Sequence, residues 1–375
     1  MQSYRTVDSK LAREPRAIAL AVAIATVWSG CAPGSEPDPE PAASEISAAE
    51  IDATDTINSF DISAGGRKFR INGVATFLLG VSYFTGIAAP AATIREDFTR
   101  LHANGFNLVR VWALWNNQSQ GGPKIELFNS SGVINTATMN ALLALLDAAK
   151  ARNIIVDLTF DKGYYPLMSV ATYRNALDAV ADRIAGYRGV LIDIANEVVP
   201  GVLTQADVGT IRAQLPLYPD RIATASVGIG LPWGDHHIPL LSSYVTTGRL
   251  DVADAHCCRD DAWPTTTTQM VNEVRADACC VRKPIYFSEP NRCRYPGIGG
   301  GGTEDCSPAN GARALADFKN AARNCKGAGC AGWVFHTAAS YFLNLGTLRD
   351  EYRFAVEATV EDQLAGSLAT VNFPD

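Results

Sequence analysis

One stretch decides the fold: Val190-Leu191-Ile192-Asp193-Ile194-Ala195-Asn196-Glu197. An apolar run of this kind is typical of a strand that is buried on both faces of a parallel sheet, and here a carboxylate directly follows it. A second run, Pro284-Ile285-Tyr286-Phe287-Ser288, ends at Glu289 in the same way. Parallel strands end at one edge of their sheet, so we expect Glu197 and Glu289 to face one pocket although 92 residues separate them.

Apolar runs of this kind alternate with amphipathic helical stretches along most of the chain. Eight of them are strand candidates: Phe77–Phe84, Asn107–Trp112, Ile154–Phe160, Val190–Ala195, Arg221–Val227, Val252–His256, Pro284–Ser288 and Gly332–His336. Eight strands with crossover helices predict an α/β fold, the closed (β/α)8 or TIM barrel, rather than an open doubly wound sheet. No glycine-rich phosphate loop follows the first run, which argues against a nucleotide-binding fold.

A hairpin signal precedes the barrel pattern. Phe60-Asp61-Ile62 and Lys68-Phe69-Arg70-Ile71 flank Ala64-Gly65-Gly66, a turn sequence. We therefore predict an N-terminal β-hairpin that caps the barrel floor, and one catalytic barrel over residues 58–375.

The segment before the barrel has the pattern of an export signal. Residues 1–30 place four basic side chains before a 12-residue apolar stretch, which is too short to span a membrane, and Ser29-Gly30-Cys31 follows. This ending resembles a bacterial lipoprotein cleavage box, with Cys31 as the lipidated residue, although Trp28 departs from the usual aliphatic residue. Residues 31–57, rich in Pro, Glu, Ala and Ser, predict a disordered tether. We expect a monomeric cell-envelope lipoprotein or secreted protein that meets membranes only through this anchor.

Charge and cysteine content further restrict the possible partners and cofactors of the protein. Removing residues 1–30 leaves 28 basic against 37 acidic side chains, a net charge of −9 that excludes nucleic acid as a partner. Eight cysteines remain besides Cys31, and an even number in an exported chain favours disulfides, whose pairing the sequence does not give. A zinc site is the alternative, but the adjacent Cys-Cys pairs lack the spacing of zinc knuckles. The pair His236-His237 likewise has no third ligand at a helpful spacing, so we expect no metal and no organic cofactor.

Two carboxylates at one pocket suit the hydrolysis of a glycosidic bond. One carboxylic acid protonates the leaving oxygen, and a second carboxylate attacks the anomeric carbon or activates water. From the residues alone, the alternative is that Glu197 and Glu289 are ordinary loop glutamates, which the matching strand ends and the neighbouring Asn196 make a weaker interpretation.

Over residues 58 to 368 the chain resembles the retaining glycoside hydrolases built on eight-stranded barrels, clan A, and most closely family 5, the cellulase and mannanase family. The resemblance implies that Glu197 is the acid/base and Glu289 the nucleophile. It also implies substrate-site roles for the strand-end residues Arg110, Asn196, His256 and Trp333. A carboxyl separation of about 5–5.5 Å, the retaining spacing, is expected on this basis.

The chain also departs from the family pattern. Val198 stands where Pro often follows Asn-Glu, strand three has no His at its end, and Cys257-Cys258 stand where a Tyr commonly follows the strand-six His. The substrate expected is a β-linked glucan or mannan-like polysaccharide or oligosaccharide. Two rival functions remain open: a surface glycan-binding lipoprotein that has lost turnover, and a metal-dependent barrel hydrolase.

Aromatic residues near the strand ends are weaker candidates. Trp115 and Trp263 have polar neighbours and are predicted to stack on sugar rings, with core packing as the alternative. His336, at the end of strand eight, is predicted either to line the cleft or to pack at the strand end.

Overall fold

The computed structural model describes residues 57–337 except 104, 117–122, 216–220, 229–237, 257–262, 291, 295–303 and 306–310. The predictions for the leader, Cys31 and the tether up to residue 56 lie outside these residues. Among the described helices, none combines the length and the apolar character that a membrane span requires.

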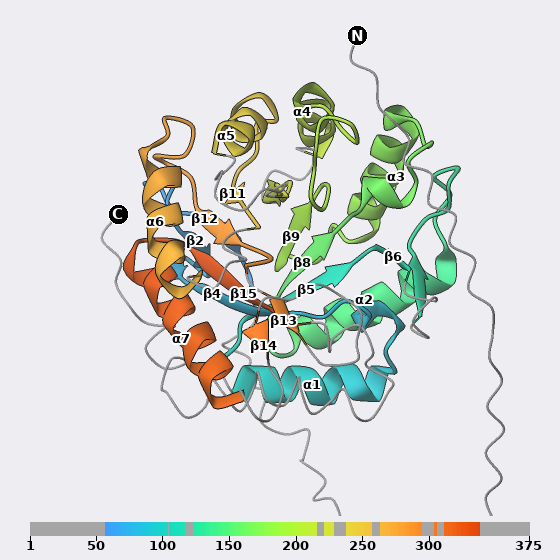
Figure 1. The fold of residues 1–375 in the computed structure, drawn as a ribbon. Helices are drawn as coiled ribbons and strands as arrows, with labels where there is room; N and C mark the ends of the chain where they lie inside the picture. Colours follow the sequence, from blue (N-terminus) through green and yellow to red (C-terminus); the bar gives the residue numbers. More distant parts are fainter. Residues whose placement is uncertain are drawn as a thin grey trace, which may run out of the picture. The chain divides into compact units, whose positions relative to one another are not determined.

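Eight parallel strands form the barrel that the sequence predicts (Figure 1). In chain order they are β4 (Leu78–Ser82), β5 (Leu108–Trp112), β8 (Ile155–Thr159), β9 (Val190–Asp193), β10 (Ala223–Thr224), β11 (Ala253–Asp254), β12 (Ile285–Phe287) and β15 (Gly332–Thr337). Among the described residues, each pairs with the next except β10, which has no ladder with β11, and β15 pairs with β4. A single parallel bridge, Val227 with Ala255, joins the ends of strands five and six and nearly closes the ring.

Helices surround this ring, as the alternation of the sequence predicts (Figure 1). The described ones are α1 (Ala91–Ala103), α2 (Thr136–Lys150), α3 (Val170–Arg183), α4 (Gln205–Gln214), α5 (Ile238–Thr247), α6 (Trp263–Ala276) and α7 (Gly311–Gly327). Short elements complete the chain: the 3₁₀ turns η1 (Gly86–Ala88) and η3 (Lys162–Tyr164), the pair β6 (Leu114–Asn116) and β7 (Lys124–Glu126), and the pair β13 (Arg292–Arg294) and β14 (Glu304–Asp305).

The helix boundaries have local causes. Asn135 caps α2, because its side-chain oxygen accepts hydrogen bonds from the backbone N–H groups of Ala137 and Thr138. Thr204 and Asp207 form a capping box at the start of α4. The sequence pattern missed α5, which has only ten residues, several of them Ser or Thr, and buries just Leu241, Tyr244 and Val245.

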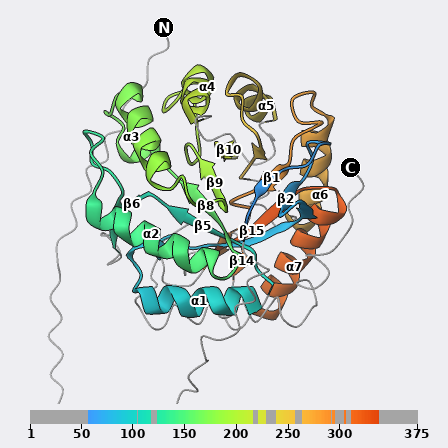
Figure 2. The same ribbon diagram turned by 180° about the vertical axis from the view of Figure 1, so that it is seen from behind.

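The predicted hairpin is present. β1 (Phe60–Ile62) pairs antiparallel with β2 (Phe69–Ile71), and β3 (Val74–Thr76) adds a third strand (Figure 2). The rings of Phe60 and Phe69 stack with centroids 5.6 Å apart, and Phe69 meets Tyr286 of strand seven edge to face. We call the buried cluster beneath the barrel the floor. It joins Ile57, Phe60, Phe69, Leu78, Leu108, Ile155, Leu191, Ile222, Val252, Tyr286, Ala331 and Val334.

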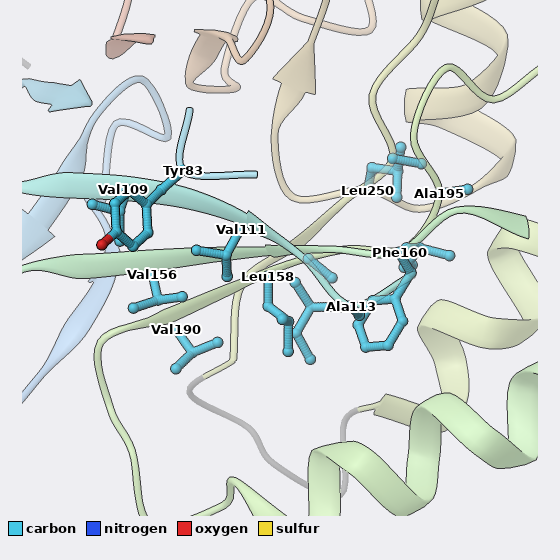
Figure 3. Close-up of a cluster of buried hydrophobic side chains, with 14 of the residues drawn as sticks. Tyr83, Val109, Val111, Ala113, Val156, Leu158, Phe160, Val190, Ala195 and Leu250 are labelled. Carbon is cyan, nitrogen blue, oxygen red and sulfur yellow. The ribbon is translucent and has the colours of Figure 1, made fainter. Parts of the chain in front are cut away.

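A second, larger core fills the space between the strands and the helices. Val109 and Val111 of β5 lie beside Val156 and Leu158 of β8 on this outer face (Figure 3). The residues between them, Arg110 and Asp157, are also fully buried, and side chains along a strand alternate between its two faces. Arg110 and Asp157 therefore point into the barrel, where the site is built.

Candidate active site

Arg110 is the centre of the polar layer inside the barrel. Its side chain is fully buried, and its Nη1 donates to Oε1 of Glu289 at 2.6 Å. Nη2 donates to Oδ2 of Asp193 at 3.0 Å and to Oδ1 of Asn196 at 2.8 Å, and Nε donates to Oγ1 of Thr159 at 2.9 Å. One guanidinium thus joins strands two, three, four and seven.

Carboxylates surround this guanidinium. Burial by itself lowers the pKa of Arg110, but Glu289, Asp157, Asp193 and Asp254 outweigh burial and raise the pKa above its ordinary value. Arg110 therefore stays charged. It also stacks over Trp112, with its Cζ 4.5 Å from the ring centroid, a cation–π contact that supports the charged form.

Two of the neighbouring acids are shifted in the opposite direction. Burial raises the pKa of Asp157 to about 7, although the nearby Arg110 acts against the rise. Burial likewise raises the pKa of Asp254 well above its ordinary value, and the charge of Asp193 adds to the effect. One cation cannot balance four buried anions, and protonation of some of these carboxyls relieves the imbalance.

Glu197 and Glu289 lie together, as the strand-end argument predicts. Glu289 is buried, whereas the side chain of Glu197 is half-exposed at 48%. The ring of His256 bridges them, because its Nδ1 is 3.3 Å from Oε1 of Glu197 and 3.5 Å from Oε2 of Glu289. The ligand atoms of this trio all lie within 4.8 Å of one another, so one oxygen of each carboxylate is close to the other.

These three side chains also have the composition of a possible metal site. Within the part of the chain that the structure describes, no other group of three or more His, Cys, Asp and Glu side chains is close enough to hold an ion. The contacts from His256 to two carboxylates are, however, equally those of a ring that hydrogen-bonds between two carboxyl groups.

The amide of Asn196 has a fixed orientation. Because Oδ1 accepts from Arg110, the Nδ2 group is the end of the amide that can donate elsewhere. Asn196 is only partly buried, and it lies beside Glu197 in the chain. It is therefore available to donate a hydrogen bond to a ligand hydroxyl next to the two carboxylates.

The expected position of Trp333 is wrong. Trp333 is fully buried in the core between strands and helices, edge to face with Phe287 at 5.9 Å. The cause is strand alternation: Trp333 lies three residues before His336, and residues three apart point to opposite faces. His336 is the residue of strand eight that reaches the site, with Nε2 3.5 Å from Oε2 of Glu289 and Nδ1 2.9 Å from Oγ of Ser82.

Of the other two aromatic candidates, Trp115 and Trp263, the structure describes the side chain of Trp115. Trp115 lies on β6 beside Phe84, with ring centroids 4.8 Å apart, and is partly exposed. Phe84 stacks flat on Trp112 at 3.8 Å and meets the ring of His336 at 5.1 Å, so this cluster adjoins the site. Trp263 begins α6, but its side chain lies outside the described residues.

Several residues in the site escaped the sequence prediction. Asp157, Asp193 and Asp254 are acids within apolar strand runs, and this pattern is a sequence signal for a buried polar layer. Ser226 and Thr159 could not be identified from the sequence, because the role of a buried hydroxyl depends on its hydrogen-bond partners, which the sequence does not show. Thr159 ends strand three and accepts a hydrogen bond from Arg110.

Cysteine pairing is partly visible. The structure pairs Cys279 with Cys280 and Cys325 with Cys330. Cys257, Cys258 and Cys306 lie outside the described residues, as does the side chain of Cys293. The disulfides of an exported protein stay a prediction.

No protein-family model matches the sequence, and no curated protein matches it. Solved structures do match. One described as a glycoside hydrolase has a TM-score of 0.58 at 13% identity, and the match covers 74% of this chain and 65% of that chain, just under two thirds of its length. GH5_18 from Streptomyces cattleya, in complex with GlcNAc, has a TM-score of 0.56 at 16% identity, covering 80% and 82%.

A family 5 mannosidase from Rhizomucor miehei matches with a TM-score of 0.55 at 12% identity, covering 81% of this chain and 99% of that chain. At such identities the likeness concerns the fold. The chain has the (β/α)8 barrel fold of family 5 glycoside hydrolase structures.

Proposed function

We propose that the protein is a retaining glycosidase that cleaves a β-linked glucan or mannan-like glycan, with Glu289 as nucleophile and Glu197 as acid/base. The observation that carries the proposal is the geometry of the two carboxylates. They have oxygens within 4.8 Å of one another at the same end of the barrel, and His256 lies between them. Retaining enzymes have carboxyl groups about 5–5.5 Å apart, whereas inverting enzymes need about 6.5–9.5 Å.

In the first step, a carboxylate oxygen of Glu289 forms a bond to the anomeric carbon. The bond from that carbon to the glycosidic oxygen breaks, and the leaving oxygen takes the proton of Glu197. Arg110 donates to Oε1 of Glu289 and keeps this carboxylate ionised before the attack. The product is a glycosyl ester on Glu289.

In the second step, Glu197 removes a proton from water, and the water oxygen attacks the same carbon. The ester bond breaks, Glu289 leaves as a carboxylate, and the sugar is released with its original configuration. Esterification removes the charge of Glu289, so the ionised form of Glu197 meets less repulsion when it must act as base. Asn196 donates its Nδ2 hydrogen to the sugar hydroxyl next to the anomeric carbon.

Substrate, location and assembly belong to the same proposal. Solved neighbours described as mannosidases support mannose-containing substrates, together with glucans, as the first to test. The leader and Cys31 support export and a lipid anchor, with the tether holding a monomeric barrel away from the membrane. No metal or organic cofactor takes part.

The test is a panel of β-glucans and mannans with wild type, Glu197→Gln and Glu289→Gln. We expect each variant to abolish release of reducing ends while its circular dichroism and Tm stay near those of wild type. Glu96→Gln, an exposed glutamate on α1, is the matched control and should keep full activity. NMR of the first product should show the retained anomer.

Full activity in both site variants, or an inverted first product, would overturn the proposal. Binding of an oligosaccharide by calorimetry with no release of reducing ends from wild type would instead favour a glycan-binding protein. Two departures from the family pattern favour this second function: residues 157–161 contain no His at the end of strand three, and Cys257-Cys258 stand where a Tyr commonly follows the strand-six His.

A further inference from the structure

Asp193 ends strand four inside the barrel, four residues before Glu197, and no sugar-contacting role falls to it. It is fully buried. Its Oδ2 accepts from Arg110 Nη2 at 3.0 Å and from Ser226 Oγ at 2.9 Å, and its Oδ1 accepts from the backbone N–H of Ser226 at 3.0 Å. Both oxygens of this carboxylate therefore face donors.

The first connection runs from Asp193 to the nucleophile. Arg110 directs Nη2 at Asp193 and Asn196, with Ser226 Oγ farther away at 3.4 Å, and this turns Nη1 toward Glu289. A planar guanidinium held at two points has little freedom to rotate. Asp193 thus fixes the direction from which Arg110 meets Glu289, and with it the orientation of the Asn196 amide.

The second connection runs from Asp193 to the acid/base. Ser226 Oγ gives its hydrogen to Asp193 and accepts the backbone N–H of Glu197 at 3.3 Å. The backbone oxygen of Ser226 accepts the N–H of Val198 at 2.8 Å. Ser226 therefore holds two consecutive peptide groups of the turn that carries Glu197.

That turn requires such support. Glu197 has a φ of +46°, in the left-handed region that a residue with a side chain seldom adopts and that surrounding contacts must maintain. Gly228, two residues after Ser226, lies close behind: a methyl group there would come within 3.0 Å of Cβ of Glu197. The end of strand five thus forms the support for the acid/base.

We infer that Asp193 and Ser226 are positioning residues that align both carboxylates of the site, Glu289 through Arg110 and Glu197 through its backbone. This inference rests on the proposed function and deepens it. Asn at position 193 would not serve, because its NH2 group would have to face one of three donors. Ala at position 226 would leave the N–H of Glu197 without its Ser226 Oγ acceptor.

The experiment compares Asp193→Asn and Ser226→Ala with Asp251→Asn. Asp251 is the matched control, because it also accepts hydrogen bonds from an arginine, Arg212, and from a backbone N–H, that of Ala223, but it lies directly before the floor residue Val252. Each enzyme is assayed for kcat/KM on phenyl and 2,4-dinitrophenyl β-glycosides of the sugar that wild type cleaves. Dinitrophenolate leaves without a proton, so only the phenyl glycoside needs the acid.

We expect Ser226→Ala to lose about 30-fold or more on the phenyl glycoside and less than about threefold on the dinitrophenyl glycoside. Asp193→Asn should lose about 100-fold on both, mostly in kcat, because both substrates need the attack by Glu289. Asp251→Asn should stay within about threefold of wild type. Equal losses on both substrates in Ser226→Ala, or full activity in Asp193→Asn, would overturn the inference.

Crystal structures of the variants supply a readout that needs no activity. Ser226→Ala should release Glu197 from its left-handed conformation, and Asp193→Asn should lengthen the contact from Arg110 to Glu289. Unchanged side chains would refute the positioning roles even if the wild type cleaved no glycan. Absence of glycosidase activity in wild type, with both displacements observed, would count against the proposed function alone.

Discussion

The two ends of the barrel interior differ in chemical character: one end is apolar, and the other is charged. At the floor, each of the eight strands contributes Leu, Ile, Val, Tyr or Ala, from within the strand or from the residue directly before it, to an apolar cluster that the hairpin residues Phe60 and Phe69 cover. At the other end, which we call the mouth, the same strands contribute Arg110, Glu289 and three buried aspartates. The floor gains free energy from burial, whereas the mouth holds charges that are stable only because they face one another.

The comparison teaches where substitutions act. A change at the floor should alter the free energy of unfolding and spare the chemistry of the molecules that remain folded. A change at the mouth should alter the chemistry, and also stability where it leaves a buried charge without its partner.

Arg110→Met should have the largest effect. It removes the one cation among four carboxylates, so we expect loss of about 3–5 kcal/mol in the free energy of unfolding, together with a fall of activity to background. Urea unfolding and the glycan assay measure the two effects. If Arg110→Met kept both its activity and its stability, the expectation that changes at the mouth alter the chemistry would be wrong.

Phe69→Ala tests the floor alone. Phe69 is fully buried between Phe60 and Tyr286, so its truncation should cost about 3–5 kcal/mol of stability. The kcat per folded molecule, measured well below the Tm, should equal that of wild type. A large fall in kcat would show that the hairpin acts on the mouth.

Asp157→Asn sharpens the comparison, because Asp157 lies between the two ends: Oδ2 accepts from the hydroxyl of the floor residue Tyr286 at 2.8 Å. Its pKa is about 7 in the folded protein against an ordinary 3.8. Between these values the folded state keeps a proton that the unfolded chain releases, so the contribution to stability is complete below pH 4 and is lost as pH rises through 7.

The measurement for Asp157 is the free energy of unfolding from pH 4 to 8. Wild type should lose stability across that window, and Asp157→Asn should show a smaller slope, because the amide does not titrate. Identical slopes in the two proteins would mean that Asp157 is ionised throughout.

Dialysis against EDTA should have the smallest effect. The trio Glu197, His256 and Glu289 has the composition of a metal site, but the proposed chemistry balances its charges with Arg110 and protons. Activity and Tm should both stay unchanged, and elemental analysis should find no stoichiometric metal. Loss of activity that zinc restores would favour a metal-dependent hydrolase instead.

Much of the fold follows from local sequence, since each strand is an apolar run and the longer helices carry an apolar stripe along one face. The strands that the sequence placed over 190–195 and 284–288 appear as β9 and β12 within those bounds. The short α5 was missed because it has only ten residues and four of them are Ser or Thr, which are weak helix formers. The prediction for Trp333 was wrong because the resemblance gave only a position near the end of strand eight. Side chains alternate between the two faces of a strand, so the exact position decides whether the ring points into the barrel or toward the helices.

By itself, the sequence placed two glutamates at the ends of parallel strands, with Asn196 beside one of them, because apolar runs and their ends are local properties. The family resemblance added Arg110. Only the tertiary structure decided what these residues meet. His336 rather than Trp333 faces Glu289, and Asp193 and Ser226 join the two carboxylates, because such contacts link strands that are up to about 250 residues apart in the chain. The physical reason is ring closure: a barrel brings every strand end to one mouth, and the register and the alternation of side chains then select which atoms touch.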